Sequence, residues 1–134
     1  RRQGANPRFF LLAEAGYNPY TVVVATSEAF LEKNPAVVEA FVKATRAGWA
    51  SYLANPAPAN GVMGKLNTTM DAQAFAEAAA SHTHLIEDDF TRQHGLGSMT
   101  LDRWETLISQ LVYLGVIEKE QAPSASSCFK SYAD

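Results

Sequence analysis

The feature that most constrains the fold is a pair of short apolar runs near the N-terminus. Residues 9–12 read Phe-Phe-Leu-Leu and residues 21–24 read Thr-Val-Val-Val, bounded by Pro7, Gly16 and Pro19. Such runs are typical of strands buried on both faces of a sheet. An unpaired buried backbone group costs about 1–3 kcal/mol, so buried strands need neighbours. Two strands cannot form a covered sheet, and we therefore expect partner strands in another segment, with this sequence a piece of a longer protein.

The remainder of the chain has a helical pattern. Apolar residues recur at steps of three and four, and residues that favour helix caps precede several of these stretches. The expected helices cover residues 27–33, 35–54, about 55–66, 71–82, 87–94 (a short helix or a turn) and 100–115. The serine-rich run after Pro123 is expected to be an exposed tail.

Composition excludes several classes of function. The chain has 134 residues, of which 47% are hydrophobic and 19% charged, as in one globular domain. Its net charge of -3 argues against nucleic acid or an anionic membrane surface as a partner. No apolar run approaches the roughly 20 residues of a spanning helix. The single cysteine, Cys128, excludes an intrachain disulfide and a cysteine-rich metal site.

No residue pattern predicts catalysis, a metal site or a cofactor. Three histidines and three carboxylates lie within residues 82–94, but His82 and His84 are two apart and point to different sides of a helix. We therefore interpret this segment as a solvated polar connector. The chain has no nucleophile motif, and Cys128 lies in the polar tail without a nearby histidine.

The best candidate for a ligand site is the loop between the two apolar runs. Tyr17 and Tyr20 flank Asn18 and Pro19 directly before the second run. Aromatic faces and an amide at the mouth of a strand suit a small-molecule site. An ordinary turn with half-buried tyrosines explains the same residues equally well.

Several segments, taken together, resemble a known family. In order and spacing they are similar to the C-terminal part of ABC-transporter substrate-binding proteins of the periplasmic binding protein type II fold, in the branch for nitrate, sulfonate, taurine and thiamine-pyrimidine precursors. The similarity extends over nearly the whole chain. The segments that carry it are 15–30, 34–38, 41–44, 97–104 and 110–117.

The resemblance implies an α/β fold of two lobes, of which this chain is the helix-rich C-terminal part with two buried strands near its N-terminus. Residues 1–20 would be the end of the second lobe and the hinge loop, and residues 21–134 the hinge strand and the helices returning to the first lobe. It implies ligand contact by Tyr17, Asn18 and Tyr20.

The implied function is that of a solute-binding component of an ABC importer, not an enzyme. It would be exported to the periplasm, capture a small polar or heteroaromatic solute, and meet the membrane only through the transporter permease or a lipid anchor outside this chain. Two alternatives remain open. One is an enzyme of the same fold that makes the thiamine pyrimidine from a sacrificed histidine with iron. The other is a helical interaction module, which would be a monomer, whereas we expect the isolated chain to associate.

Overall fold

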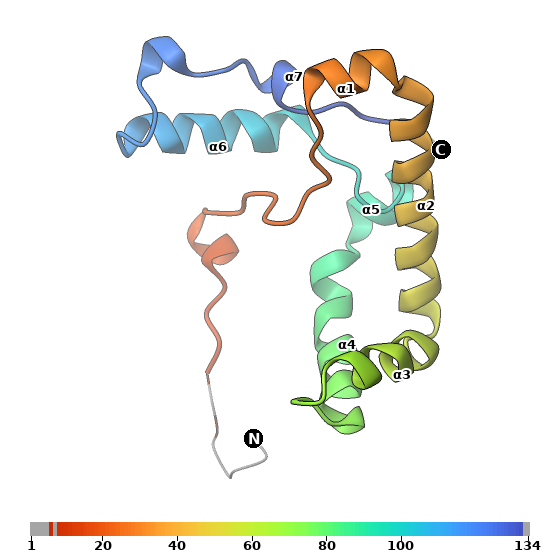
Figure 1. Cartoon of the computed structure of the whole chain (residues 1–134). Coiled ribbons are helices and arrows are strands. Elements are labelled where there is room, and N and C mark those ends of the chain that lie inside the picture. Colours follow the sequence, from red (N-terminus) through yellow and green to blue (C-terminus); the bar gives the residue numbers. More distant parts are fainter. Residues whose placement is uncertain (1–5, 7, 133–134) are drawn as a thin grey trace. The chain divides into compact units, whose positions relative to one another are not determined.

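The computed structural model describes residue 6 and residues 8–132, and these residues form helices and turns but no strand. The start of the segment expected to end the second lobe, residues 1–5 and 7, lies outside the described residues. In chain order the elements are η1 (Leu12–Ala15), α1 (Glu28–Lys33), α2 (Pro35–Ala54), α3 (Ala57–Leu66), α4 (Ala72–Ile86), α5 (Asp89–His94), α6 (Leu101–Tyr113), η2 (Lys119–Gln121) and α7 (Ala125–Cys128) (Figure 1).

The prediction of two buried strands is wrong. Residues 21–24 have no regular structure, and in the first run Leu12 already belongs to the 3-10 helix η1. Both runs are exposed: the side chain of Phe10 is 84% accessible and that of Val22 is 91% accessible. A strand exists only through the ladder that it shares with a neighbour, and no described residue supplies one. Apolar, β-branched composition alone therefore leaves these segments irregular.

The helical part of the prediction is confirmed, because the signals that start these helices are local. The side-chain oxygens of Ser27, Asp71 and Thr100 each accept a hydrogen bond from the backbone N–H three residues ahead. Pro35 occupies the first turn of α2, where its missing N–H costs nothing. The helix after Asp71 runs four residues beyond its expected end, to Ile86.

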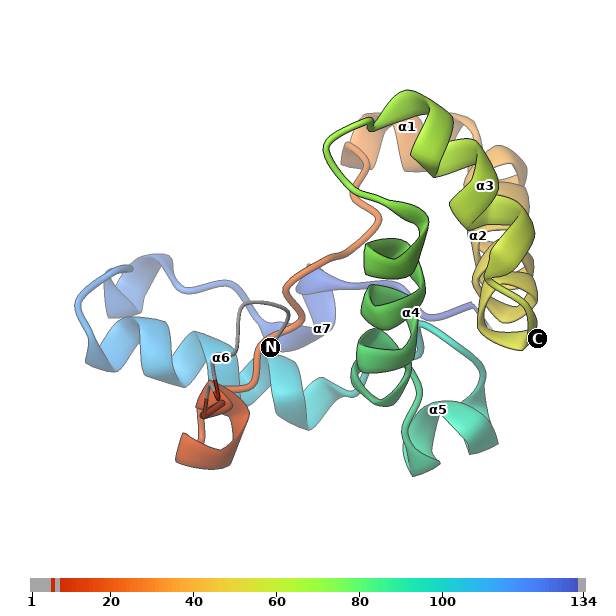
Figure 2. The same ribbon diagram turned by 90° about the horizontal axis from the view of Figure 1, so that it is seen from below.

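The chain divides into two compact units, and the first contains Val24–Ser98 with the described residues after Lys130. Within it, α1 contacts α2, and α3 lies side by side with α4 (Figure 2). Phe75 and Ala79 on α4 are buried, and a Cβ at Gly64 on α3 would lie 3.8 Å from the ring of Phe75. An added Cβ at position 64 would therefore make only an ordinary van der Waals contact, and the ring of Phe75 packs against α3 at this position.

The second unit contains the described residues up to Val23 together with Met99–Lys130. In this unit α7 packs against α6. Ala125 is buried, and the ring of Phe129 stacks on Trp104 with centroids 6.0 Å apart and planes 9° apart. The expectation of an exposed tail is therefore wrong for Ala125, Cys128 and Phe129, which are buried or half-buried, whereas Ser126 and Ser127 are exposed as expected.

Large apolar side chains remain uncovered in both units. Among the described residues the buried apolar side chains are Val38, Phe75, Ala79 and Ala125. Side chains exposed by a third or more include Phe9, Phe10, Val22, Phe30, Phe41, Trp49, Leu66, Leu85, Tyr113 and Val116. Within residues 6 and 8–132, no helix has both the length and the apolar character needed to cross a bilayer.

We predict that the chain associates in solution, because exposed apolar surface is removed from water when two copies meet. Size-exclusion chromatography with light scattering should give a mass above the 14.6 kDa of one chain. The double substitution Phe9→Ser with Phe10→Ser should lower that mass, whereas Glu14→Gln, in a polar position nearby, should not. A monomer at every concentration would contradict this prediction.

We also predict that Asp71→Ala destabilises α4. The substitution removes the oxygen that accepts from the Ala74 N–H, 2.7 Å away, and loss of such a cap costs about 1 kcal/mol. Urea unfolding followed by circular dichroism at 222 nm measures the change. Asp71→Asn is the matched control, because an asparagine oxygen accepts the same bond and should leave stability nearly unchanged.

Candidate functional site

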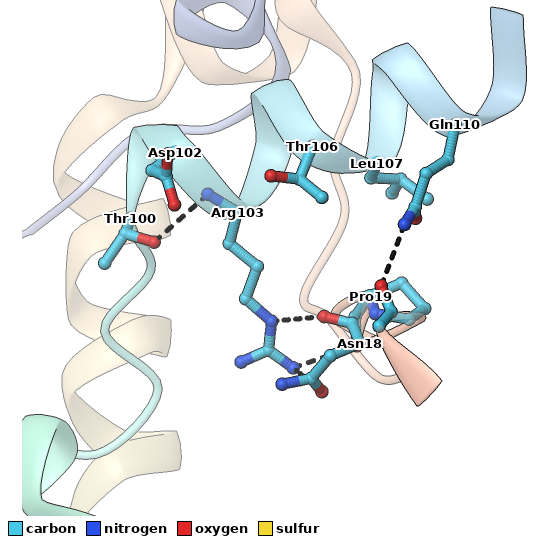
Figure 3. A pocket seen from close by; sticks show the side chains of 9 residues that line it. Asn18, Pro19, Thr100, Asp102, Arg103, Thr106, Leu107 and Gln110 are labelled. Atoms are coloured by element: carbon cyan, nitrogen blue, oxygen red, sulfur yellow. Dashed lines mark hydrogen bonds between the residues drawn. The ribbon is translucent and has the colours of Figure 1, made fainter. Parts of the chain in front are cut away.

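The candidate site lies between loop 16–20 and one face of α6, both within the second unit. Positions 103, 106, 107 and 110 are spaced so that they share one face of the helix. Loop and helix together border a half-open cavity of about 300 Å³ (Figure 3). Its lining residues are Gly16, Asn18, Pro19, Thr100, Asp102, Arg103, Thr106, Leu107 and Gln110.

Arg103 makes most of the contacts between the loop and the helix. Its Nε donates a hydrogen bond to the backbone oxygen of Asn18, and its Nη2 donates to the side-chain Oδ1 of Asn18 at 2.7 Å and to the backbone oxygen of Pro19 at 3.0 Å (Figure 3). Its guanidinium carbon also lies 4.0 Å from the centre of the Tyr20 ring, a cation–π distance. One side chain thus holds three consecutive loop residues.

Two further hydrogen bonds fasten the ends of the loop. The amide Nε2 of Gln110 donates to the backbone oxygen of Gly16 at 2.8 Å. At the other end, the backbone N–H of Thr100 donates to the phenolic oxygen of Tyr20, also at 2.8 Å. Gly16 has φ 90°, a left-handed conformation that glycine adopts without strain, and this turn ends η1 and directs the chain into the loop.

The three residues predicted to contact ligand occupy different environments. Asn18 lines the cavity, whereas Tyr17 and Tyr20 do not. The side chain of Tyr17 is 41% accessible. The ring of Tyr20 lies between Arg103 and Trp104, with the indole centroid 5.8 Å away. Tyr20 is therefore engaged within the chain, and ligand contact by the three residues stays a prediction.

Trp104 completes an aromatic row that runs from the loop to the C-terminal segment. Its indole lies between the rings of Tyr20 and Phe129. The indole Nε1 is buried and has no hydrogen-bond partner among the residues that the structure describes. Trp104 therefore stabilises the site by ring packing and not by a polar contact.

The cavity lining is polar and suits hydrogen bonding to a small solute. It offers the amide nitrogen of Asn18, the carboxylate of Asp102, the hydroxyl of Thr106 and the amide oxygen of Gln110. Its volume of about 300 Å³ is at the lower end of the range for ligand pockets. No histidine or cysteine lines it.

The polar segment near residues 82–94 is used for local structure. Asp88 and Thr91 form a reciprocal capping box at the start of α5. Arg92 lies 2.8 Å from a carboxylate oxygen of Asp89 and 3.6 Å from one of Glu87. In the described part of the chain, no group of three or more histidine, cysteine or acidic residues is placed to hold a metal ion.

The sequence analysis did not single out Arg103 and Gln110. The signal that was available is the spacing of the polar residues at positions 103, 106 and 110, which lie on one face of α6 beside its apolar stripe. That spacing places the side chains on one face of the helix but does not predict which residues they contact. Their partners lie 84 to 94 residues away in the chain.

We predict that Tyr20 stabilises the second unit and that Tyr17 does not. Tyr20→Ala removes a hydrogen bond and a cation–π contact and should lower the free energy of unfolding by about 1–2 kcal/mol. Tyr17→Ala, the matched control, should stay within about 0.5 kcal/mol of the parent. Urea unfolding followed by Trp104 fluorescence in a Trp49→Phe background measures both. Equal effects of the two substitutions would contradict the assignment.

Comparison with known proteins finds that part of the chain is similar to a known family. Residues 1–59 match the family model described as NMT1/THI5 like. No curated protein matches the chain. No solved structure matches it either. The matched family includes solute-binding proteins and related proteins of thiamine synthesis. The match to the NMT1/THI5-like family model therefore covers less than half of the chain, and it includes all of loop 16–20.

Proposed function

We propose that the chain is a solute-binding component of an ABC importer and that loop 16–20 with α6 forms part of its ligand site. The observation that carries this proposal is that one loop has two relevant properties. The NMT1/THI5-like match covers the loop, and the same loop borders the polar cavity. The family match and the cavity are separate observations, and both support loop 16–20 as part of a ligand site.

The geometry supports a small polar or heteroaromatic solute. A cavity of about 300 Å³ has room for a single ring or a smaller group. Asn18 would donate from its amide nitrogen, while Thr106 and Gln110 supply further polar atoms on the facing helix. The exposed ring of Tyr17, next to Asn18 in the chain, is available to stack on a planar ligand.

The partner and the location follow from the same proposal. A binding component of an importer acts outside the cytoplasm and delivers its solute to the transporter permease. The family supports both points, because its solute-binding members are usually exported. Apolar side chains that are exposed in both units, such as Val22 and Phe41, are consistent with further protein contacts.

We predict that the protein in its full natural length, after dialysis, binds a member of a panel of pyrimidines, sulfonates and nitrate. Ligand at a hundred times its Kd stabilises the folded state by about 2.7 kcal/mol, which raises the melting temperature. Thermal shift followed by calorimetry measures this. A flat response to the whole panel would remove solute binding as the function.

Substitution of the side-chain amide of Asn18 tests whether the ligand binds in the cavity. Asn18→Asp keeps, and strengthens, the bond from Arg103 that positions the loop, but it replaces the amide donor. Kd should therefore rise about tenfold through loss of one hydrogen bond to the ligand, even though the loop stays docked. Gln73→Ala on α4, which removes an amide bonded only to Glu77, is the matched control and should leave Kd unchanged. An unchanged Kd in Asn18→Asp would place the ligand elsewhere.

The competing proposal is an enzyme of thiamine synthesis, because the family also has such members. Incubation of the same protein with iron, followed by mass spectrometry, tests it directly. Consumption of His82, His84 or His94 would replace the transport proposal by an enzyme that spends its own histidine. An unchanged mass would leave solute binding as the function.

A further inference from the structure

We propose that Arg103 is the positioning residue of the ligand loop, holding loop 16–20 in the one arrangement that forms the cavity. The effect on ligand affinity rests on the proposed function, whereas the positioning of the loop does not. The inference comes from the distribution of contacts between the loop and α6. Thr100 and Gln110 each make one hydrogen bond to the loop, while Arg103 makes three and also covers the Tyr20 ring.

The guanidinium group suits this role because of its shape. Its N–H groups form a rigid planar fork, so Nε and Nη2 reach three loop oxygens at once while the plane of the group faces an aromatic ring. Lysine at position 103 would keep the charge but not the fork, because an ammonium group is a compact point charge on a flexible stem. A conservative Arg103→Lys substitution therefore separates geometry from charge.

Little else holds the loop in place. Residues 16–18 are exposed, and Pro19 and Tyr20 are only half-buried. Segments with few buried contacts open locally at low cost, well below the cost of unfolding the whole unit. The docked loop is therefore one state of a local equilibrium, and Arg103 sets its population. If a ligand binds only the docked state, its apparent Kd equals the intrinsic Kd divided by the docked fraction.

Amide hydrogen exchange at Thr100 reports this equilibrium. Its N–H precedes the first turn of α6 and donates to Tyr20, so it is protected only while the loop is docked. We expect Arg103→Lys to speed its exchange about tenfold. Arg92→Lys is the matched control, since Arg92 is also half-exposed and paired with carboxylates but lies on α5, and it should leave the exchange rate unchanged.

A second variant gives an effect of the opposite sign. Asn18→Asp places a carboxylate where Arg103 now meets an amide oxygen, and a charge-assisted bond is stronger. Exchange at Thr100 should slow several-fold. Amides in the middle of α6, such as that of Ile108, should exchange at the parental rate in all variants, which separates loop release from loss of the helix. Unchanged exchange at Thr100 in Arg103→Lys, with α6 intact, would overturn the proposal.

Affinity supplies the final readout. For whichever member of the pyrimidine, sulfonate and nitrate panel binds, Arg103→Lys should raise Kd by the factor by which it lowers the docked fraction. While most molecules stay docked, exchange at Thr100 speeds up with little change in Kd, and Kd rises in proportion once the docked state is the minor one. Saturating ligand should slow that exchange in the parent protein. An unchanged Kd in a variant whose Thr100 amide exchanges at the rate of an unprotected amide would overturn the link to ligand. If no member binds, the proposed function fails, while the exchange rates alone still support or overturn loop positioning by Arg103.

Discussion

The bond between Arg103 and loop 16–20 is the constraint on which the candidate site depends. The loop belongs to no sheet, so the backbone oxygens of Asn18 and Pro19 need partners from elsewhere. Arg103 supplies both bonds from one side chain and so determines where Tyr20 lies. Tyr20 in turn meets Trp104, and Trp104 meets Phe129. Arg103 thus connects the loop to the helix, and Trp104 connects the same helix to the C-terminal segment of this unit.

The helices illustrate what local chemistry is able to specify. Their starts depend on bonds between residues three apart, such as those of Ser27 and Asp71, and their faces depend on steps of three and four. Both signals are contained in a short window of sequence. For that reason α1, α2 and α6 could be predicted to within a residue or two. The end of α4 at Ile86 was missed because no glycine or proline near this position marks where the helix stops.

The strands illustrate the opposite case. Composition at residues 9–12 and 21–24 says that the segments favour an extended, buried environment, but a strand also requires a partner that composition does not provide. The described residues contain no such partner, and the runs are irregular and exposed. The docking of residues 125–129 was missed for a related reason. Phe129 packs on Trp104, and α7, which contains Ala125, packs on α6; these partners lie more than ten residues away in the chain.

The candidate site combines these two kinds of information. Asn18 and Tyr20 were predicted from the sequence as ligand contacts; the family match includes both, Asn18 lines the cavity and Tyr20 does not, and ligand contact by them stays a prediction. Arg103, Thr106 and Gln110 lie outside residues 1–59, and only the folded chain brings them opposite the loop. One wall of the cavity lies inside the matched segment and the other outside it. Under the proposed function, the family match would therefore bear on the kind of ligand, and the face of α6 formed by positions 103, 106, 107 and 110 would decide which solute fits.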